Sequence, residues 1–128
     1  MSEKAAASEK NVLGGELRAC SYAPLTGYFR DGCCATQDQE GVAHLVCIQA
    51  TDEFLAFSGE RGNDLITPRP EMRFRGLKHG DRWCLHVLRW IEAWEAGRAP
   101  RVVLEATHER VLNYVPLSAL KRYALDVN

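Results

Sequence analysis

The sequence of 128 residues lacks several features that would indicate a function directly. No apolar run approaches the ~18 residues that a membrane-spanning helix needs, and the first ten residues lack the basic and apolar regions of a secretory signal. The formal net charge is only −1, so no overall field favours nucleic acid or an anionic membrane. We therefore expect a cytoplasmic protein that binds neither, with residues 1–10 as a solvated, disordered tail and residues 11–128 as a single domain.

Common catalytic motifs are also missing. The sequence contains no GxSxG, no GxxxxGK[ST] and no HExxH. No two of its five cysteines are spaced as CxxC; they occupy positions 20, 33, 34, 47 and 84. Because this number is odd and nothing indicates export, the sequence predicts reduced cysteines.

Residues 81–97 contain a pattern with the period of a helix. Apolar residues recur there at three- or four-residue intervals: Trp83, Val87, Trp90 and Trp94. All three tryptophans of the protein are in this stretch, and each can bury roughly 150–250 Å². With Asp81 as a possible N-cap and Gly97 after the last turn, the pattern predicts one long helix that organises the core.

The rest of the chain predicts a small α+β domain. The other expected elements are a strand over 44–50, a short helix that begins after the cap Thr51, a strand over 101–106 and a last helix over 117–125. Residues 107–114 fit either a short helix or a hairpin whose second strand is 111–115, and the hairpin is preferred. Residues 62–80 predict a long ordered loop. The expected architecture is a mostly antiparallel sheet packed against the helix over 81–97, with two short helices.

Five segments together resemble a known family. They are DGCC (31–34), TDEFLAFS (51–58), GNDL (62–65), GDRWCL (80–85) and VLEATHE (103–109). In combination they are similar to an uncharacterised, mainly bacterial family, the domain of unknown function 2237, from about residue 11 to residue 124. The resemblance implies an α+β architecture and no established activity, so no catalytic role is transferred. The position of His86 is often cysteine in that family, and its histidine here argues against an all-thiolate site.

Charge is distributed unevenly along the chain, and this predicts an anion site. Residues 31–60 contain six carboxylates and no Lys or Arg, whereas residues 61–89 contain seven cations. The two segments can neutralise each other, or the arginines can bind carboxylate or phosphate oxygens. The candidate ligand-binding residues belong to the loop and the start of the helix: Asp64, Arg69, Asp81, Arg82 and Trp83. The structural alternative is an Asp–Arg latch that fastens the loop.

The cysteines and histidines offer a second set of candidates. Cys33 and Cys34 can be buried apolar residues, metal ligands or reactive thiols. In a helix Cys84 and His86 are about 200° apart, and only in a strand would they form half of a zinc site. The preferred helix therefore predicts no cofactor, with zinc at Cys33, Cys34 and Cys84 as the alternative.

Proton transfer is the remaining catalytic hypothesis. His108 and Glu109 are adjacent and could transfer a proton, so with Cys34 they are the catalytic candidates. The other histidines show no ligand spacing and are interpreted as surface or hydrogen-bonded residues.

Three functional hypotheses follow. The preferred one is a binding domain for a small anionic molecule, with a pocket under the loop 62–80 near the start of the helix over 81–97. The second is a metal-binding or thiol-dependent enzyme that uses Cys33, Cys34 and Cys84. The third is an interaction module without a ligand. The sequence leaves open whether the protein is an enzyme, what its ligand is and whether it forms oligomers.

Overall fold

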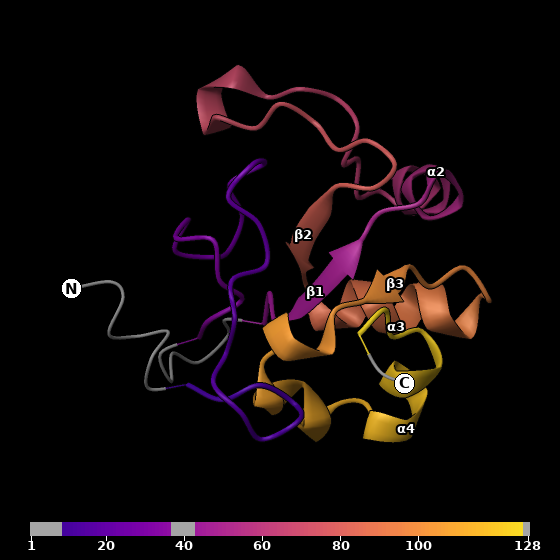
Figure 1. Cartoon of the computed structure of the whole chain (residues 1–128). Helices are drawn as coiled ribbons and strands as arrows, with labels where there is room; N and C mark the ends of the chain where they lie inside the picture. The colour runs from indigo at the N-terminus through magenta and orange to yellow at the C-terminus, as the bar shows by residue number, and fades with distance from the viewer. Residues whose placement is uncertain (1–8, 37–42, 127–128) are drawn as a thin grey trace.

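The computed structural model describes residues 9–36 and 43–126. A three-stranded antiparallel sheet in the order β2-β1-β3 lies at its centre (Figure 1). The strands are β1 (Val46–Gln49), β2 (Arg82–Leu85) and β3 (Arg101–Val102). In the described part of the chain the α-helices are α2 (Asp52–Glu60), α3 (Val87–Glu95) and α4 (Leu117–Arg122). The α+β class with a small antiparallel sheet and a tryptophan-bearing helix is confirmed.

The long helix predicted over 81–97 is wrong in its first turns, which form the strand β2. Trp83 and Leu85 fit a strand as well as a helix, and pairing of β2 with β1 supplies their backbone hydrogen-bond partners. The helix begins only after His86, whose backbone is extended and whose Nδ1 accepts a hydrogen bond from the Leu88 N–H at 3.1 Å. The predicted end is confirmed, because Gly97 has a left-handed backbone with φ of 74°.

The two faces of the sheet pack against different groups of residues. Val46, Ile48 and Leu85 belong to the main core, together with the fully buried Trp90 of α3. Cys47 and Cys84 are partners in the β1–β2 register, so their side chains share the opposite face. That face packs against a second, smaller cluster of Cys20, Cys34, Val103 and Ala106.

The segment after β3 differs from the preferred prediction. The strand expected over 101–106 stops at Val102, and residues Leu104–Ala106 form the 3₁₀ helix η2. The returning strand over 111–115 is wrong, because Glu109–Asn113 form a second 3₁₀ helix, η3. The chain then enters α4 after Pro116 and returns beside β3, where the Val102 N–H donates to the Tyr123 carbonyl at 2.9 Å.

The connection from α2 to β2 arches over one end of the sheet (Figure 1). It contains the 3₁₀ helix η1 (Pro70–Met72). Its base is closed by a hydrogen bond of 2.7 Å from the Leu77 N–H to the Leu65 carbonyl, and its Phe74 ring lies 5.0 Å from the Trp83 ring. This is the ordered loop that the sequence predicts.

The beginning of the chain is described only in part. Residues 1–8 of the expected tail lie outside the described residues. Glu9 Oε1 lies 2.8 Å from His108 Nε2, and Lys10 pairs with Glu16 in an isolated bridge. Within the described ranges, no helix is long and apolar enough to cross a membrane.

Candidate functional site

A cavity of about 830 Å³ runs along the outer edge of β2. Its walls come from four separate parts of the chain, which are residues 26–30, His44, residues 63–74 and residues 83–92. Because β2 is an edge strand, residues from both of its faces line the cavity. Trp83 and Leu85 therefore border it on the side of the main core, and Cys84 borders it on the side of the cysteine cluster.

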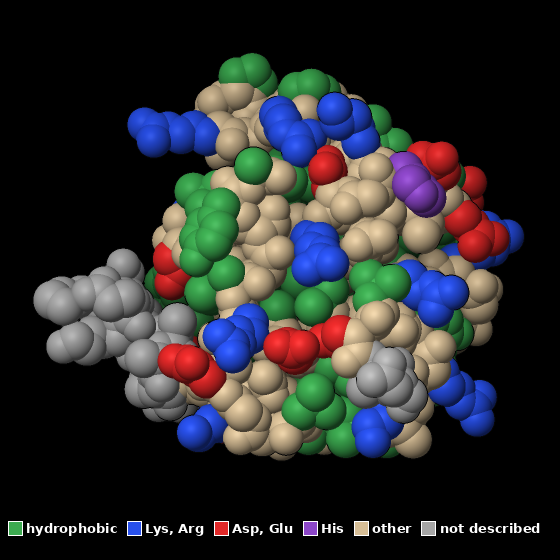
Figure 2. All heavy atoms as spheres, viewed as in Figure 1, with side chains coloured by type: hydrophobic (Ala, Val, Ile, Leu, Met, Phe, Trp, Pro, Cys, Tyr) green, Lys and Arg blue, Asp and Glu red, His purple; other side chains and the backbone are tan. Residues whose placement is uncertain are grey.

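Three arginines line this cavity, Arg30, Arg69 and Arg89. The Arg30 guanidinium lies over the Trp83 ring at 5.4 Å from its centroid, and Nη1 donates to the Leu25 carbonyl at 3.2 Å. Arg89 Nη1 lies 3.3 Å from Glu92 Oε1 and donates to the Arg61 carbonyl at 3.1 Å. On the face shown in Figure 2, Lys and Arg lie next to Asp and Glu, and this face carries no single large basic surface.

Two histidines line the same cavity. The rings of His44 and His86 meet edge to face, with centroids 5.2 Å apart. Burial lowers the pKa of His44, with further lowering from His86 and Arg30. Burial and then Arg89 lower the pKa of His86. Both rings are therefore neutral near pH 7.

The hydrogen bonds of the two rings differ. His86 Nδ1 accepts the Leu88 N–H, so the neutral ring carries its proton on Nε2 and offers a donor there. That tautomer also argues against His86 as a metal ligand, because its remaining nitrogen is protonated. His44 Nδ1 is buried and has no hydrogen-bond partner among the described residues.

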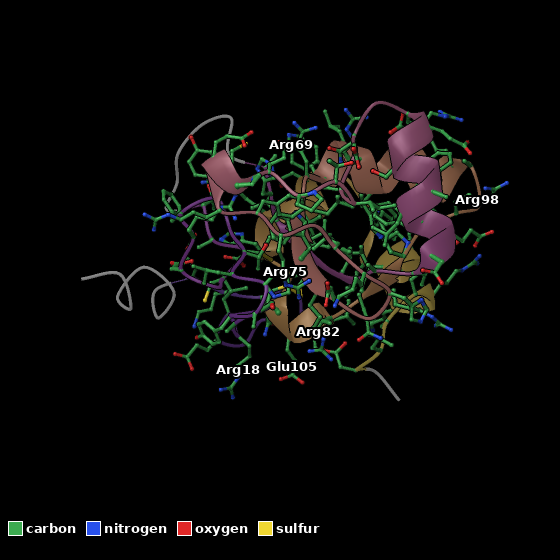
Figure 3. All side chains as sticks on the ribbon, turned by 90° about the horizontal axis from the view of Figure 1, so that it is seen from above. Arg18, Arg69, Arg75, Arg82, Arg98 and Glu105 are labelled. Carbon is green, nitrogen blue, oxygen red and sulfur yellow. A yellow bond between two sulfur atoms is a disulfide. The ribbon has the colours of Figure 1, made fainter. Side chains whose placement is uncertain are left out.

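The predicted ligand-binding residues fall into two groups. Asp64, Arg69 and Trp83 line the cavity, whereas Asp81 and Arg82 are not among its lining residues. Figure 3 shows Arg69 and Arg82 well apart, on different sides of the molecule. Arg82 is exposed on β2.

Asp81 fastens the loop instead of capping a helix. Its carboxylate accepts from Arg75 Nη1 and Nη2 at 3.1 and 3.3 Å and from the Lys78 N–H at 2.8 Å. Burial raises the pKa of Asp81, but these hydrogen bonds outweigh it and hold the pKa below its usual value. Asp64 has a local role as well: hydrogen bonds from Thr67 and then Ile66 lower its pKa and tighten the turn.

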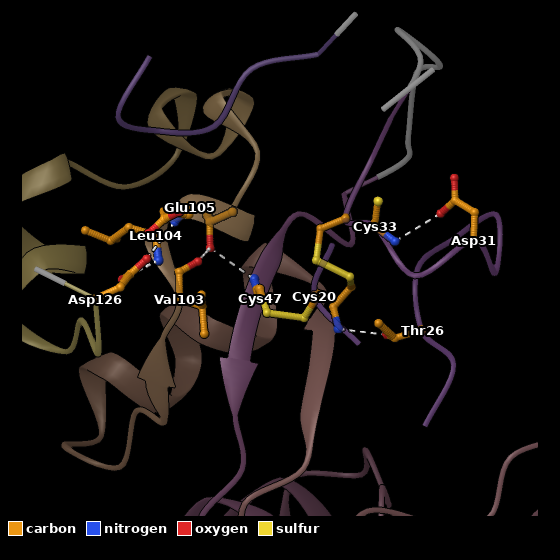
Figure 4. The surroundings of a disulfide bond; sticks show 12 residues. Cys20, Thr26, Asp31, Cys33, Cys47, Val103, Leu104, Glu105 and Asp126 are labelled. Carbon is orange, nitrogen blue, oxygen red and sulfur yellow. Dashed lines mark hydrogen bonds between the residues drawn. A yellow bond between two sulfur atoms is a disulfide. The ribbon is translucent and has the colours of Figure 1, made fainter. Parts of the chain in front are cut away.

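The prediction of reduced cysteines is wrong, because four of the five form two disulfides, Cys20–Cys47 and Cys34–Cys84. The pairs are 27 and 50 residues apart in sequence, so no local spacing could indicate them. Cys33 is free and buried beside the turn of Asp31, whose carboxylate accepts its N–H at 3.1 Å (Figure 4). Burial, Asp31 and Glu9 raise the pKa of the Cys33 thiol to about 11. Of the proposed set, the structure joins Cys34 to Cys84 and leaves Cys33 protonated and apart.

The proton-transfer candidates do not meet each other. His108 is buried and its Nε2 contacts Glu9 Oε1 at 2.8 Å, while Nδ1 accepts the Arg110 N–H at 3.0 Å. Glu109, its neighbour in sequence, is exposed. Neither residue lines the cavity, and Cys34 is bonded to Cys84.

Several cavity residues were not among the sequence candidates. Arg30 was not named, Arg89 was counted only among the cations of residues 61–89, and His44 and His86 were interpreted as surface or hydrogen-bonded residues. Their approach depends on the pairing of β1 with β2, which places His44 and His86 just beyond the ends of adjacent antiparallel strands. The positive charge of residues 61–89 was the signal that pointed toward two of the arginines, Arg69 and Arg89.

Comparison with known proteins places the chain in one family. No curated protein matches the chain. The sequence model of the family DUF2237, described as an uncharacterized protein conserved in bacteria, matches residues 10–124. This match includes every residue that lines the cavity and all five cysteines, so the whole candidate site lies inside the matched region. The chain therefore belongs to this uncharacterised bacterial family.

Proposed function

We propose that the protein binds a small anionic molecule in the cavity beside β2. The observation that carries this proposal is the charge of the cavity wall, where Arg30, Arg69 and Arg89 face only two carboxylates, Asp64 and Glu92. Guanidinium groups bind carboxylate and phosphate oxygens through paired N–H donors. A cavity with this excess of cations favours an anion.

Both carboxylates already have hydrogen-bond or ion-pair partners in the protein, which supports the proposal of an anionic ligand. Asp64 Oδ1 accepts the N–H groups of Ile66 and Thr67 at 2.9 and 3.1 Å. Glu92 pairs with Arg61 at 3.6 Å and with Arg89 at 3.3 Å. Arg69 is exposed and makes no side-chain hydrogen bond within the ranges that the structure describes. Its charge interacts with that of Asp64, and its guanidinium can still turn to a ligand.

The remaining wall defines the uncharged part of the ligand. Phe74, Trp83 and Leu85 present apolar surface, and a neutral His86 offers one N–H donor. Pockets that combine an apolar wall with a few placed polar groups are typical of small-molecule sites. An anion with an apolar or aromatic portion fits this wall better than a bare inorganic ion.

Calorimetry with matched probes tests the proposal. We expect phenyl phosphate and benzoate to bind and to raise the melting temperature, and 2-phenylethylamine, which has a similar ring and the opposite charge, to do neither. Arg69→Gln should weaken the binding of phenyl phosphate by about tenfold or more, the value of a hydrogen bond to a charged group.

Arg82→Gln provides the control, because Arg82 directly precedes the cavity residue Trp83 in the sequence but does not line the cavity. The dissociation constant of this variant for phenyl phosphate should stay within about twofold of the parent value, since surface substitutions have small effects. If the anions fail to bind, or if Arg69→Gln and Arg82→Gln weaken them equally, the proposal is wrong.

A further inference from the structure

The two disulfides are close enough to each other to exchange. The Sγ atoms of Cys20, Cys34 and Cys47 all lie within 4.8 Å of one another. Since Cys20 is bonded to Cys47 and Cys34 to Cys84, the Cys34 sulfur lies beside both sulfurs of the other disulfide. Cys47 and Cys84 lie opposite each other in the β1–β2 pair, so both disulfides lie on the same face of the sheet.

One of these disulfides also adjoins the cavity. Cys84 is among the residues that line the cavity, and the other three bonded cysteines are not. Cys34 and Cys84 are only 0% and 2% exposed, so their bond is closed to bulk solvent. Because Cys84 borders the cavity, a reagent bound there lies next to this cysteine, in a wall that also carries Arg30, Arg69 and Arg89.

We propose that the cavity takes a small thiol that carries carboxylates, and that this thiol exchanges with the Cys34–Cys84 disulfide. The inference rests on the proposed function, because Arg30, Arg69 and Arg89 would bind the carboxylates. It adds a covalent reaction to binding, and it names the class of ligand.

The exchange takes place in two balanced steps. The thiol gives up its proton to solvent, and its thiolate attacks Cys84 Sγ, forming a mixed disulfide with Cys84 and breaking the bond to Cys34. The electron pair of that bond leaves on Cys34, which is now a thiolate beside the second disulfide. Cys34 then attacks Cys20 or Cys47, forming a new disulfide and releasing the other cysteine as a thiolate that takes a proton from solvent. No external oxidant is consumed, because each step makes one S–S bond and breaks one.

Cys33 does not compete in this sequence. It belongs to a separate cluster with Leu17 and Ala35, and burial with two nearby carboxylates holds it as a protonated thiol. A thiol in that state is a poor nucleophile. Cys34, although adjacent in the chain, is the sulfur placed to continue the reaction.

Three thiols that differ in charge provide the test. Oxidised protein is treated with mercaptosuccinate, 2-mercaptoethanol or cysteamine, quenched with acid, alkylated and mapped by mass spectrometry. Each rate is divided by the rate of the same thiol with hydroxyethyl disulfide, which removes differences in intrinsic nucleophilicity. We expect mercaptosuccinate to modify Cys84 first and at least about tenfold faster than 2-mercaptoethanol, as one charge-assisted hydrogen bond predicts, and cysteamine to be slowest. A Cys34–Cys20 or Cys34–Cys47 bond should follow.

Variants separate this inference from the binding proposal. Arg69→Gln should remove most of the preference for mercaptosuccinate, and Arg82→Gln should retain it. If phenyl phosphate binds but the three normalised rates are equal, or if the first adduct forms on Cys20 or Cys47, the exchange reaction is refuted while the binding proposal stands. If phenyl phosphate does not bind and the rates are equal, both fail.

Discussion

Cys47 lies directly opposite Cys84 in the antiparallel pair of β1 and β2, yet each is bonded to a cysteine from another segment, Cys20 or Cys34. Residues 9–36 contribute no named helix or strand and only isolated bridges. The two disulfides therefore attach this irregular segment to the sheet at two points. The same segment also contacts the outer edge of β2 beside the cavity, since the Cys84 N–H donates to Thr26 Oγ1 at 2.8 Å.

Removing either disulfide should destabilise the protein strongly. The closed loops span 27 and 50 residues, and cross-links of this size stabilise by about 2–4 kcal/mol, mainly by restricting the unfolded chain. We expect the double variant Cys20→Ala/Cys47→Ala to lower the free energy of unfolding by that amount in urea titrations. Cys33→Ala is the matched control, because it removes a buried thiol that is in no disulfide. Equal stability losses in the control and the double variant would show that the cross-link contributes nothing.

Stability should fall as the pH decreases below 6.5, the usual pKa of histidine. Burial lowers the pKa of His44 and His86 in the folded protein. Below pH 6.5 these two histidines therefore bind more protons in the unfolded chain than in the folded one, and this favours unfolding. Their contribution is fully present above pH 6.5 and is lost as the pH falls through the lowered values. Urea titrations between pH 8 and pH 5 measure the slope.

His86→Asn gives a sharp control for this slope. Asparagine can still accept the Leu88 N–H at the start of α3, but it does not titrate. We expect the variant to keep most of its stability at pH 8 and to lose part of the dependence below pH 6.5. An unchanged slope would mean that His86 is not one of the groups responsible.

The sequence predicts local structure well where a short-range signal is sufficient. The cap at Thr51 is confirmed, since its Oγ1 accepts the Phe54 N–H at 3.1 Å, and so is the helix end before Gly97. The start of α3 was missed because residues 82–86 have both helical periodicity and strand-forming side chains. Only the pairing with β1, more than 30 residues earlier in the chain, decides between them.

The candidate site was predictable only in part for the same reason. Asp64, Arg69 and Trp83 belong to one region of the sequence, and its charge and loop character pointed to them. Arg30 and His44 reach the cavity from distant segments, through contacts that no spacing encodes. The disulfides are likewise long-range, and an odd number of cysteines favoured the reduced form.

Glu9, which contacts His108 in the structure, should contribute more to stability than Glu109, which follows His108 in the sequence. Glu9 Oε1 contacts His108 Nε2 at 2.8 Å and accepts the Thr36 N–H at 3.1 Å. Glu9→Ala leaves a buried ring nitrogen without this partner, which costs about 1–3 kcal/mol. Glu109→Ala, at an exposed position, should change the free energy of unfolding by less than about 0.5 kcal/mol. Chemical denaturation compares the two, and equal effects would contradict the assignment of Glu9 as the partner.

The loop that carries Arg69 depends on Gly76. Its φ is 86°, and a Cβ at this position would lie 2.1 Å from the Ile66 carbonyl oxygen, where the two arms of the loop lie against each other. Gly80 has a similar φ of 93° with nothing within 4 Å of its Cβ position, so Gly80→Ala measures backbone strain alone. We expect Gly76→Ala to cost about 1–3 kcal/mol more than Gly80→Ala, because the backbone must move to remove the overlap. If the loop positions Arg69 for a ligand, Gly76→Ala should also weaken phenyl phosphate binding in calorimetry, and Gly80→Ala should not. A loss of stability without a loss of affinity would show that the close contact between the two arms supports the fold but does not position Arg69.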